Sequence, residues 1–153
     1  MNKAQLLHKL DIAWLDLNDS FAGLSETQMV QPGVTGDWSV TDILGHVTTW
    51  EEEALKHLPH ILEGKRPPRY SVLYGGIDAF NALKTAENRE RPPAEVLARF
   101  EVVHERLVAY IEAAPDELIA TETRFRRRIR LDTYSHYPIH ARAIREWRAA
   151  QGI

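Results

Sequence analysis

Two histidines four residues apart, His136 and His140, lie in the last apolar-patterned segment of the chain. Side chains at positions i and i+4 share one face of a helix, so both imidazoles can bind the same ion. The pair falls in one helical stripe with Ile144 and Trp147, which is the face expected to turn inward. Buried imidazoles need partners, because burying an unpaired polar group costs free energy. The pattern therefore favours a metal site over two isolated core histidines.

A third candidate ligand, His46, lies far upstream, on a segment that begins with the capping pattern of Ser39 and Asp42. It is off the centre of that segment's apolar stripe, so a solvated surface position is the alternative. Three neutral imidazoles leave a fourth coordination position open, as in catalytic zinc sites. Such an ion lowers the pKa of a bound water to about 7 or deprotonates a bound thiol. Imidazole ligands suit zinc, nickel or iron, and their spacing does not choose among these divalent metals.

Other side chains offer weaker chemistry. Glu53 shares the flank of His46 and is a candidate general base, although the run Glu51–Glu53 equally fits a solvated helix surface. Glu53 and Asp132 are also candidates for orienting the imidazole rings. The sequence contains no Gly-x-Ser-x-Gly nucleophile motif and no glycine-rich phosphate loop. The remaining histidines are interpreted as structural or surface residues: His8, His57, His60 and His104.

Five arginines occur within the seven residues 124–130. One interpretation is a solvated, strand-like or looping connector whose charge is offset by acidic neighbours. The alternative is a dock for an anionic substrate or cofactor, because guanidinium groups match carboxylate and phosphate. Nucleic-acid binding is not expected, because the net charge is −3 and no recognition-helix pattern or aromatic platform accompanies the arginines. The candidate substrate contacts are Trp50, Arg126, Arg128 and Tyr137.

The composition bounds the class of protein. The 153 residues, 44% hydrophobic and 27% charged, fit a single globular domain with one core over residues 1–153. The absence of cysteine excludes disulfides, thiolate ligands and a thiol nucleophile of the chain's own. No apolar leader is evident, and no stretch approaches the roughly 20 apolar residues of a membrane span. We therefore expect a cytoplasmic protein with no membrane partner.

Four long amphipathic segments are expected to position the candidate residues. Apolar spacings of three and four predict helices over residues 3–24, from Ser39 to near Pro59, from Val96 to just before Pro115, and over 133–150. Pro138 would lie in the first turn of the last helix or kink it. A shorter helix is expected over 77–90, and residues 64–76 and 116–131 are expected to be connectors. Together these elements predict one all-α four-helix bundle.

Two segments resemble signatures of the DinB-like superfamily. Gly36–Glu51 is similar to that family's second-helix signature, and Asp132–Trp147 is similar to its last-helix signature. The helix lengths between them also fit, so the resemblance covers nearly the whole chain. It implies an up-down-down-up four-helix bundle, often a homodimer, in which three histidines hold a divalent metal. Carried over residue by residue, these ligands are His46, His136 and His140.

The resemblance also implies a range of activities. Members include thiol-dependent S-transferases and isomerases that use bacillithiol, mycothiol or glutathione, proteins resembling metal-dependent hydrolases, and damage-induced proteins without an assigned activity. A related branch, the colibactin self-protection proteins, is not expected to depend on the three-histidine site. The presence of all three histidines favours the metal-binding branch.

We therefore expect a metal-dependent enzyme that acts on a small-molecule substrate. The metal would activate water or an external low-molecular-weight thiol against a small electrophile. Two alternatives stay open: a stress-response protein that sequesters a metal or ligand without turnover, and a structural or regulatory dimer with buried histidines.

Overall fold

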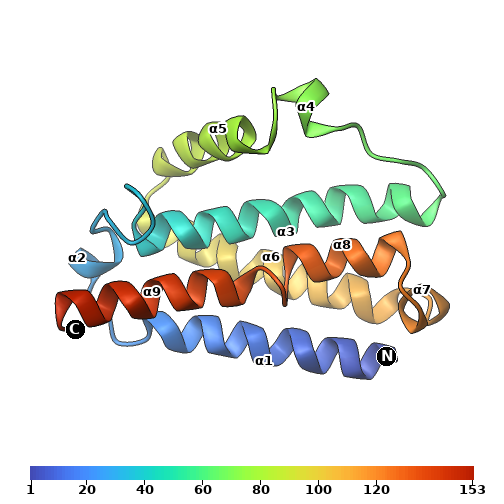
Figure 1. Ribbon diagram of the computed structural model, residues 1–153, viewed down its shortest axis with the longest axis horizontal. Helices are drawn as coiled ribbons and strands as arrows, with labels where there is room; N and C mark the ends of the chain where they lie inside the picture. The colour runs from blue at the N-terminus through green and yellow to red at the C-terminus, as the bar shows by residue number, and fades with distance from the viewer.

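The computed structural model describes residues 1–153, which form helices α1 to α9 and no strand. Four long elements lie side by side (Figure 1): α1 (Lys3–Phe21), α3 (Val40–Leu62), α6 (Pro93–Ala113), and α8 (Arg124–Asp132) continued by α9 (Tyr137–Gln151). The first and fourth elements run in one direction, and α3 and α6 run in the opposite one. The predicted all-α, up-down-down-up four-helix bundle is confirmed.

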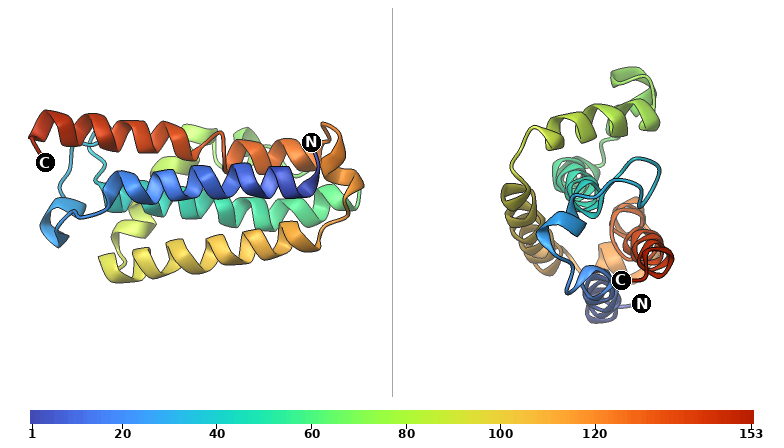
Figure 2. Two further views of the ribbon diagram at one scale, coloured as in Figure 1. Left: turned by 90° about the horizontal axis from the view of Figure 1, so that it is seen from below. Right: turned by 90° about the vertical axis from the view of Figure 1, so that its left-hand side faces the viewer.

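Four shorter helices lie in the connections: α2 (Glu26–Met29), α4 (Tyr70–Leu73), α5 (Ile77–Arg89) and α7 (Glu117–Ala120). The long connection from α3 to α6 carries α4 and α5, and α5 packs on the outer side of α3 (Figure 2). This connection allows α3 and α6 to run in the same direction. None of the helices combines the length and the apolar character that crossing a membrane requires.

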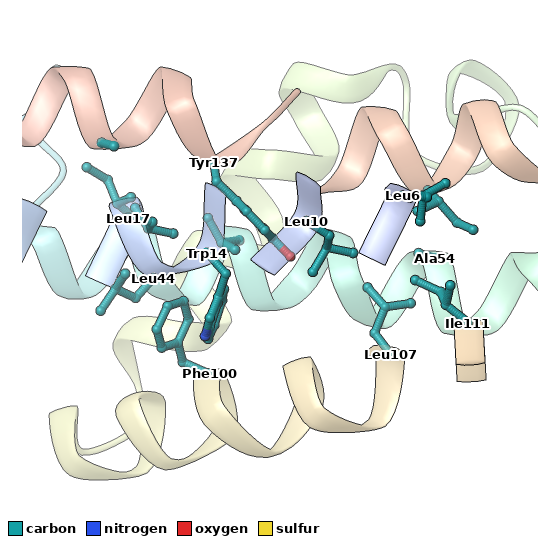
Figure 3. Close-up of a cluster of buried hydrophobic side chains, with 14 of the residues drawn as sticks. Leu6, Leu10, Trp14, Leu17, Leu44, Ala54, Phe100, Leu107, Ile111 and Tyr137 are labelled. Carbon is teal, nitrogen blue, oxygen red and sulfur yellow. The ribbon is translucent and has the colours of Figure 1, made fainter. Parts of the chain in front are cut away.

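The apolar faces of the four long elements meet in one buried core (Figure 3). Trp14 of α1 stacks on Phe100 of α6, with ring centroids 4.3 Å apart. Burying each large apolar side chain contributes about 1.5–3 kcal/mol, which makes this core the main source of stability. Other fully buried members are Leu6, Leu10, Leu17, Ile43, Leu44, Leu58, Leu107 and Ile111.

The start of α3 is fixed as the sequence predicts. Ser39 accepts a hydrogen bond from the backbone N–H of Asp42, and the Asp42 carboxylate accepts one from the backbone N–H of Ser39. The predicted end near Pro59 is wrong, because α3 continues to Leu62. Pro59 removes one helical hydrogen bond and crowds the carbonyl group four residues earlier, but the last turn of α3 still forms. The helix instead ends before Gly64, whose φ of 78° suits the left-handed region.

The arginine run is not the strand-like or looping connector that the sequence suggested. It forms the helix α8, capped by Thr123, whose hydroxyl accepts from the N–H of Arg126. Phe125 and Ile129 lie four residues apart and are both buried against the core, whereas Arg127 is exposed. Two apolar side chains on one face are therefore enough to fold a very polar segment into an amphipathic helix.

The expected last helix over 133–150 is also corrected, since α8 and α9 are separated by a break at residues 133–136. Thr133 has φ −128° and ψ −102°, which is not helical. Pro138 explains the position of the break, because a proline ring in a helix interior clashes with the carbonyl group four residues earlier. In the first turn of α9 it meets no such group and is tolerated.

Candidate metal centre

Three histidine side chains converge at the break between α8 and α9. His46 comes from α3, His136 precedes the first residue of α9, and His140 lies one turn into α9. The Nε2 atom of His136 is 3.0 Å from Nε2 of His46 and 2.9 Å from Nε2 of His140. All three candidate ligand atoms lie within 4.8 Å of one another. The structure therefore brings together the three residues that the sequence nominates.

Pro138 does not separate the two late histidines. His136 keeps right-handed helical dihedrals, φ −96° and ψ −49°, although it lies outside α9. Its side chain therefore stays on the same face as that of His140, four residues later. The ring of His46 is held from the other side by Trp38, with centroids 4.8 Å apart. Trp38, His136 and His140 together restrict the orientation of the His46 ring.

Burial keeps the three imidazoles neutral. Burial and the neighbouring imidazoles of His136 and His140 lower the pKa of His46 to about 2. Burial lowers the pKa of His136 to about 4, partly opposed by the backbone of Asp132. Burial and the neighbouring His136 lower the pKa of His140 to about 3. At neutral pH each ring therefore has a lone pair available for a ligand bond.

The donor set fits a divalent metal ion. A metal bound by imidazoles at about 2.05 Å with tetrahedral angles holds its nitrogens about 3.3 Å apart, close to the observed distances. Hydrogen bonds among the three rings do not satisfy them, because Nε2 of His136 faces two other nitrogens and has either one proton or one lone pair. Nδ1 of His136 is buried without a hydrogen-bond partner of good geometry. A cation accepting all three lone pairs would resolve this arrangement.

A cavity of about 380 Å³ opens beside these histidines. Its walls come from α3, α4, α5, α8 and the break before α9, so the long connection after α3 does contribute a site wall. The cavity is lined by His46, Trp50, Tyr70, Ile77, Asn81, Arg128, Leu131, Asp132 and His136.

One wall of the cavity is a chain of paired polar groups. Arg128 Nε donates to Asp132 at 2.6 Å, and Arg128 Nη2 donates to the Tyr70 hydroxyl at 3.2 Å. That hydroxyl donates to Glu53 at 3.1 Å, and Nε2 of His57 lies 3.6 Å from the same carboxylate oxygen. Burial raises the pKa of Asp132 to about 6, although Arg128 opposes the shift.

The other sequence candidates divide between the cavity and the rest of the bundle. Trp50 and Arg128 line the cavity, whereas Glu53 reaches it only through the Tyr70 hydroxyl. Arg126 is paired with Glu122 and donates to the carbonyl group of residue 119, so it does not reach the cavity. Tyr137 is completely buried in the core, with its hydroxyl turned away from solvent (Figure 3).

A buried polar cluster next to the site is missed by the sequence interpretation. Glu51 is completely buried and accepts hydrogen bonds from the Tyr137 hydroxyl and from Nδ1 of His104, the latter at 3.0 Å. The expected surface position of His104 is wrong, since its ring stacks on Trp14 with centroids 3.5 Å apart. Burial raises the pKa of Glu51, opposed by His104 and Tyr137. The cluster joins α3, α6 and α9 beside the break.

The fold and the group of three histidines define a helical-bundle protein. Its convergent histidines can hold a metal ion beside a cavity. The chain belongs to the DinB superfamily, whose family model matches residues 9–142. The resemblance of the second-helix and last-helix signatures to this family is therefore confirmed. No curated protein matches the chain by sequence.

Solved structures share the fold at low sequence identity. The sibling lethal factor precursor DfsB superposes with a TM-score of 0.82 and 17% identity, covering 99% of this chain and 97% of its own. The colibactin self-resistance protein ClbS, in complex with double-stranded DNA, gives 0.79 and 19%, covering 95% and 94%. A protein from Streptococcus pneumoniae gives 0.79 and 16%, covering 97% and 91%.

One expectation is overturned by these neighbours. The sequence interpretation excluded nucleic acid as a partner, on the grounds of net charge and the absence of a recognition helix. ClbS has the same fold and is solved as a complex with double-stranded DNA. Net charge and the absence of a recognition-helix pattern are therefore not sufficient grounds for excluding DNA from a protein of this fold. The exclusion is therefore wrong, and the expected homodimer stays a prediction.

The lowered histidine pKa values predict a pH-dependent stability of the metal-free protein. Below about pH 6.5 the unfolded chain takes up protons on these histidines while the folded protein does not, so the free energy of unfolding falls as pH falls. Each histidine contributes up to about 1.4 kcal/mol per pH unit. Urea unfolding of chelator-treated protein between about pH 6.5 and 5 measures the slope.

His140→Gln isolates this effect, because the buried carboxyl groups that titrate in the opposite sense remain in both proteins. The variant should lose less stability per pH unit than the wild type. His8→Gln, at an exposed position on α1, should keep the wild-type slope. Equal slopes for the wild type and His140→Gln would contradict the assigned pKa shift.

In the buried polar cluster, we expect the contributions of Tyr137 and Glu51 to the free energy of unfolding to be coupled. Tyr137→Phe leaves a buried carboxylate short of one donor and should cost about 2–3 kcal/mol of unfolding free energy, because hydrogen bonds to charged groups are strong. In a Glu51→Gln background the same change should cost only about 1 kcal/mol. Tyr110→Phe is the control, because the Tyr110 hydroxyl makes no hydrogen bond within the protein. Urea unfolding of the four proteins gives the coupling energy, and equal costs in both backgrounds would refute it.

Proposed function

We propose that this protein is a metal-dependent enzyme that activates water or an external low-molecular-weight thiol against a small electrophile. The observation that carries the proposal is the convergence of three neutral imidazole nitrogens beside a cavity of about 380 Å³. His46, His136 and His140 are the proposed ligands. The membership of the chain in the DinB superfamily supports the same assignment.

The chain's own residues would bind and orient the reactants. His46, His136 and His140 would hold the ion, and a bound ion would supply Lewis-acid chemistry to a water or thiol. Trp50 and Tyr70 would contact the electrophile and exclude water from it. The chain contains no cysteine, so a reacting sulfur would come from a diffusible thiol. In the proposed reaction the nucleophile forms a bond to the electrophilic carbon, the bond from that carbon to its leaving group (a halide or an alkoxide) breaks with the electron pair going to the leaving group, and the nucleophile's proton passes to solvent.

A protein that holds a metal or a ligand without turnover is the second candidate. The same histidines and the same cavity support it, because neither feature requires chemistry to follow binding. The two functions differ in whether product exceeds protein on a molar basis.

Protein purified without added metal should contain about one equivalent of a divalent metal by elemental analysis. Metal bound only to the folded state at 100 times its dissociation constant adds about 2.7 kcal/mol. For a chain of this size that raises the melting temperature by roughly 5–10 °C over chelator-treated protein. His140→Ala should abolish both the metal content and the shift.

His60→Ala provides the matched control, because His60 is an exposed histidine of the same helix as His46. It should keep the metal and the melting shift. If wild-type protein contains no metal and melts identically with and without chelator, the metal site is refuted.

Turnover separates the enzyme from the sequestering protein. With a low-molecular-weight thiol and a small aryl halide, the enzyme should give saturable product formation that is lost on chelation and in His140→Ala, and kept in His60→Ala. Product limited to one equivalent per protein would favour sequestration over catalysis. Hydrolysis of a small ester, followed in the same set of proteins, tests the water-dependent form of the reaction.

A further inference from the structure

We propose that the cavity beside the three histidines selects an uncharged, flat, apolar molecule that carries a carbonyl-type hydrogen-bond acceptor, and that Asp132 excludes anionic molecules from it. The inference rests on the proposed function for its biological meaning, because it names the substrate class of the same site. The sequence instead suggested that arginines in this region serve as a dock for anions.

The walls of the cavity favour a flat apolar body. Trp50 and Tyr70 lie with ring centroids 5.3 Å apart, and Phe80 packs behind both of them. Ile77 and Leu131 line the cavity and are each about half exposed, which places them where a ligand would enter. Aromatic and aliphatic walls of this kind bury a small planar molecule with favourable dispersion contacts.

Apart from the histidine nitrogens and the Asp132 carboxylate, the polar groups with free hydrogen-bonding capacity in the cavity are donors. Trp50 Nε1 donates to Asn81 Oδ1 at 2.9 Å, and because the indole can only donate, this contact assigns the amide orientation. The Asn81 amide hydrogens are therefore free to bind an acceptor. Arg128 uses Nε for Asp132 and Nη2 for Tyr70, and its other N–H groups have no protein partner. A carbonyl oxygen in the cavity would find donors on both sides.

The charges on the cavity wall disfavour an anion. The positive charge of Arg128 is opposed by Asp132 at 2.6 Å, and Glu53 lies behind the Tyr70 hydroxyl. Burial and Arg128 lower the pKa of His57, opposed by Glu53. A carboxylate ligand would therefore meet Asp132 without an unpaired cation to offset the repulsion. Arg128 acts here as a donor whose charge is already compensated.

The experiment uses metal-free protein above neutral pH, so that its outcome does not depend on the metal or on turnover. Ligand-observed NMR titrations compare acetophenone, benzoate and toluene, which share a phenyl ring and differ in acceptor and charge. Acetophenone should bind about fivefold tighter than toluene through its hydrogen bonds, and at least about tenfold tighter than benzoate because of the charge on Asp132.

Two variants test the roles of individual residues. Asp132→Asn keeps an acceptor for Arg128 but removes the negative charge, so benzoate should bind about tenfold tighter or better while acetophenone changes little. Asn81→Ala removes one of the two donors and should reduce the preference for acetophenone over toluene about twofold. Asp11→Asn, at an exposed position on α1, is the control and should leave all three affinities unchanged.

The proposal is overturned if benzoate is the tightest ligand of the wild type, if no probe binds, or if benzoate binding is unchanged in Asp132→Asn. If the probes bind with the expected preferences but the protein never binds metal, the proposed function is refuted and the proposed selectivity of the cavity is kept. If the protein contains stoichiometric metal but binds none of the probes, the proposed selectivity is refuted and the proposed metal site is kept.

Discussion

The candidate site depends on one backbone constraint, which is that a proline such as Pro138 disfavours the interior of a helix. The fourth long element therefore breaks at residues 133–136 and restarts at Tyr137. The break has two consequences for side chains. It leaves His136 free of the helix while keeping it in phase with His140, and it turns Tyr137 into the core toward Glu51.

The hydrogen bond between Tyr137 and Glu51 ties this break to the rest of the bundle. Glu51 lies on α3, five residues after His46, and His104 of α6 donates to the same carboxylate oxygen. Burying such a group costs more free energy than burying an apolar side chain of the same size. Its effect is to fix how α3 and α9 meet, and the three histidines lie on those two helices and on the residue just before α9. We therefore infer that the cluster of Glu51, His104 and Tyr137 serves mainly to set the relative position of the helices.

The sequence predicted the parts of the structure that depend on local patterns. The phases of His136 and His140, the capping residues Ser39 and Asp42, and the long apolar stripes are all properties of one helix at a time. The missed features depend on which neighbour faces a residue. Glu51 sits in a run of three glutamates and His104 between two further glutamates, so both read as surface.

Arg126 and Arg128 show within one helix that local sequence does not reveal which neighbour a side chain faces. Both belong to α8 and differ by two positions, which is a rotation of about 200° around the helix axis. Arg128 therefore faces the cavity, whereas Arg126 pairs with Glu122 near the start of the helix. Composition and local spacing cannot separate them, because the separation is set by how Phe125 and Ile129 turn α8 against the core.

The charge arrangement gives the two halves of the site different preferences. Around Arg128 the charges of the protein are already compensated, by Asp132 directly and by Glu53 through Tyr70. A divalent ion held by three neutral imidazoles would instead keep its full charge. An anionic nucleophile would then be drawn to the histidine side, and an uncharged electrophile to the aromatic side. Separate regions for the two reactants would keep them from competing for one subsite in the proposed reaction.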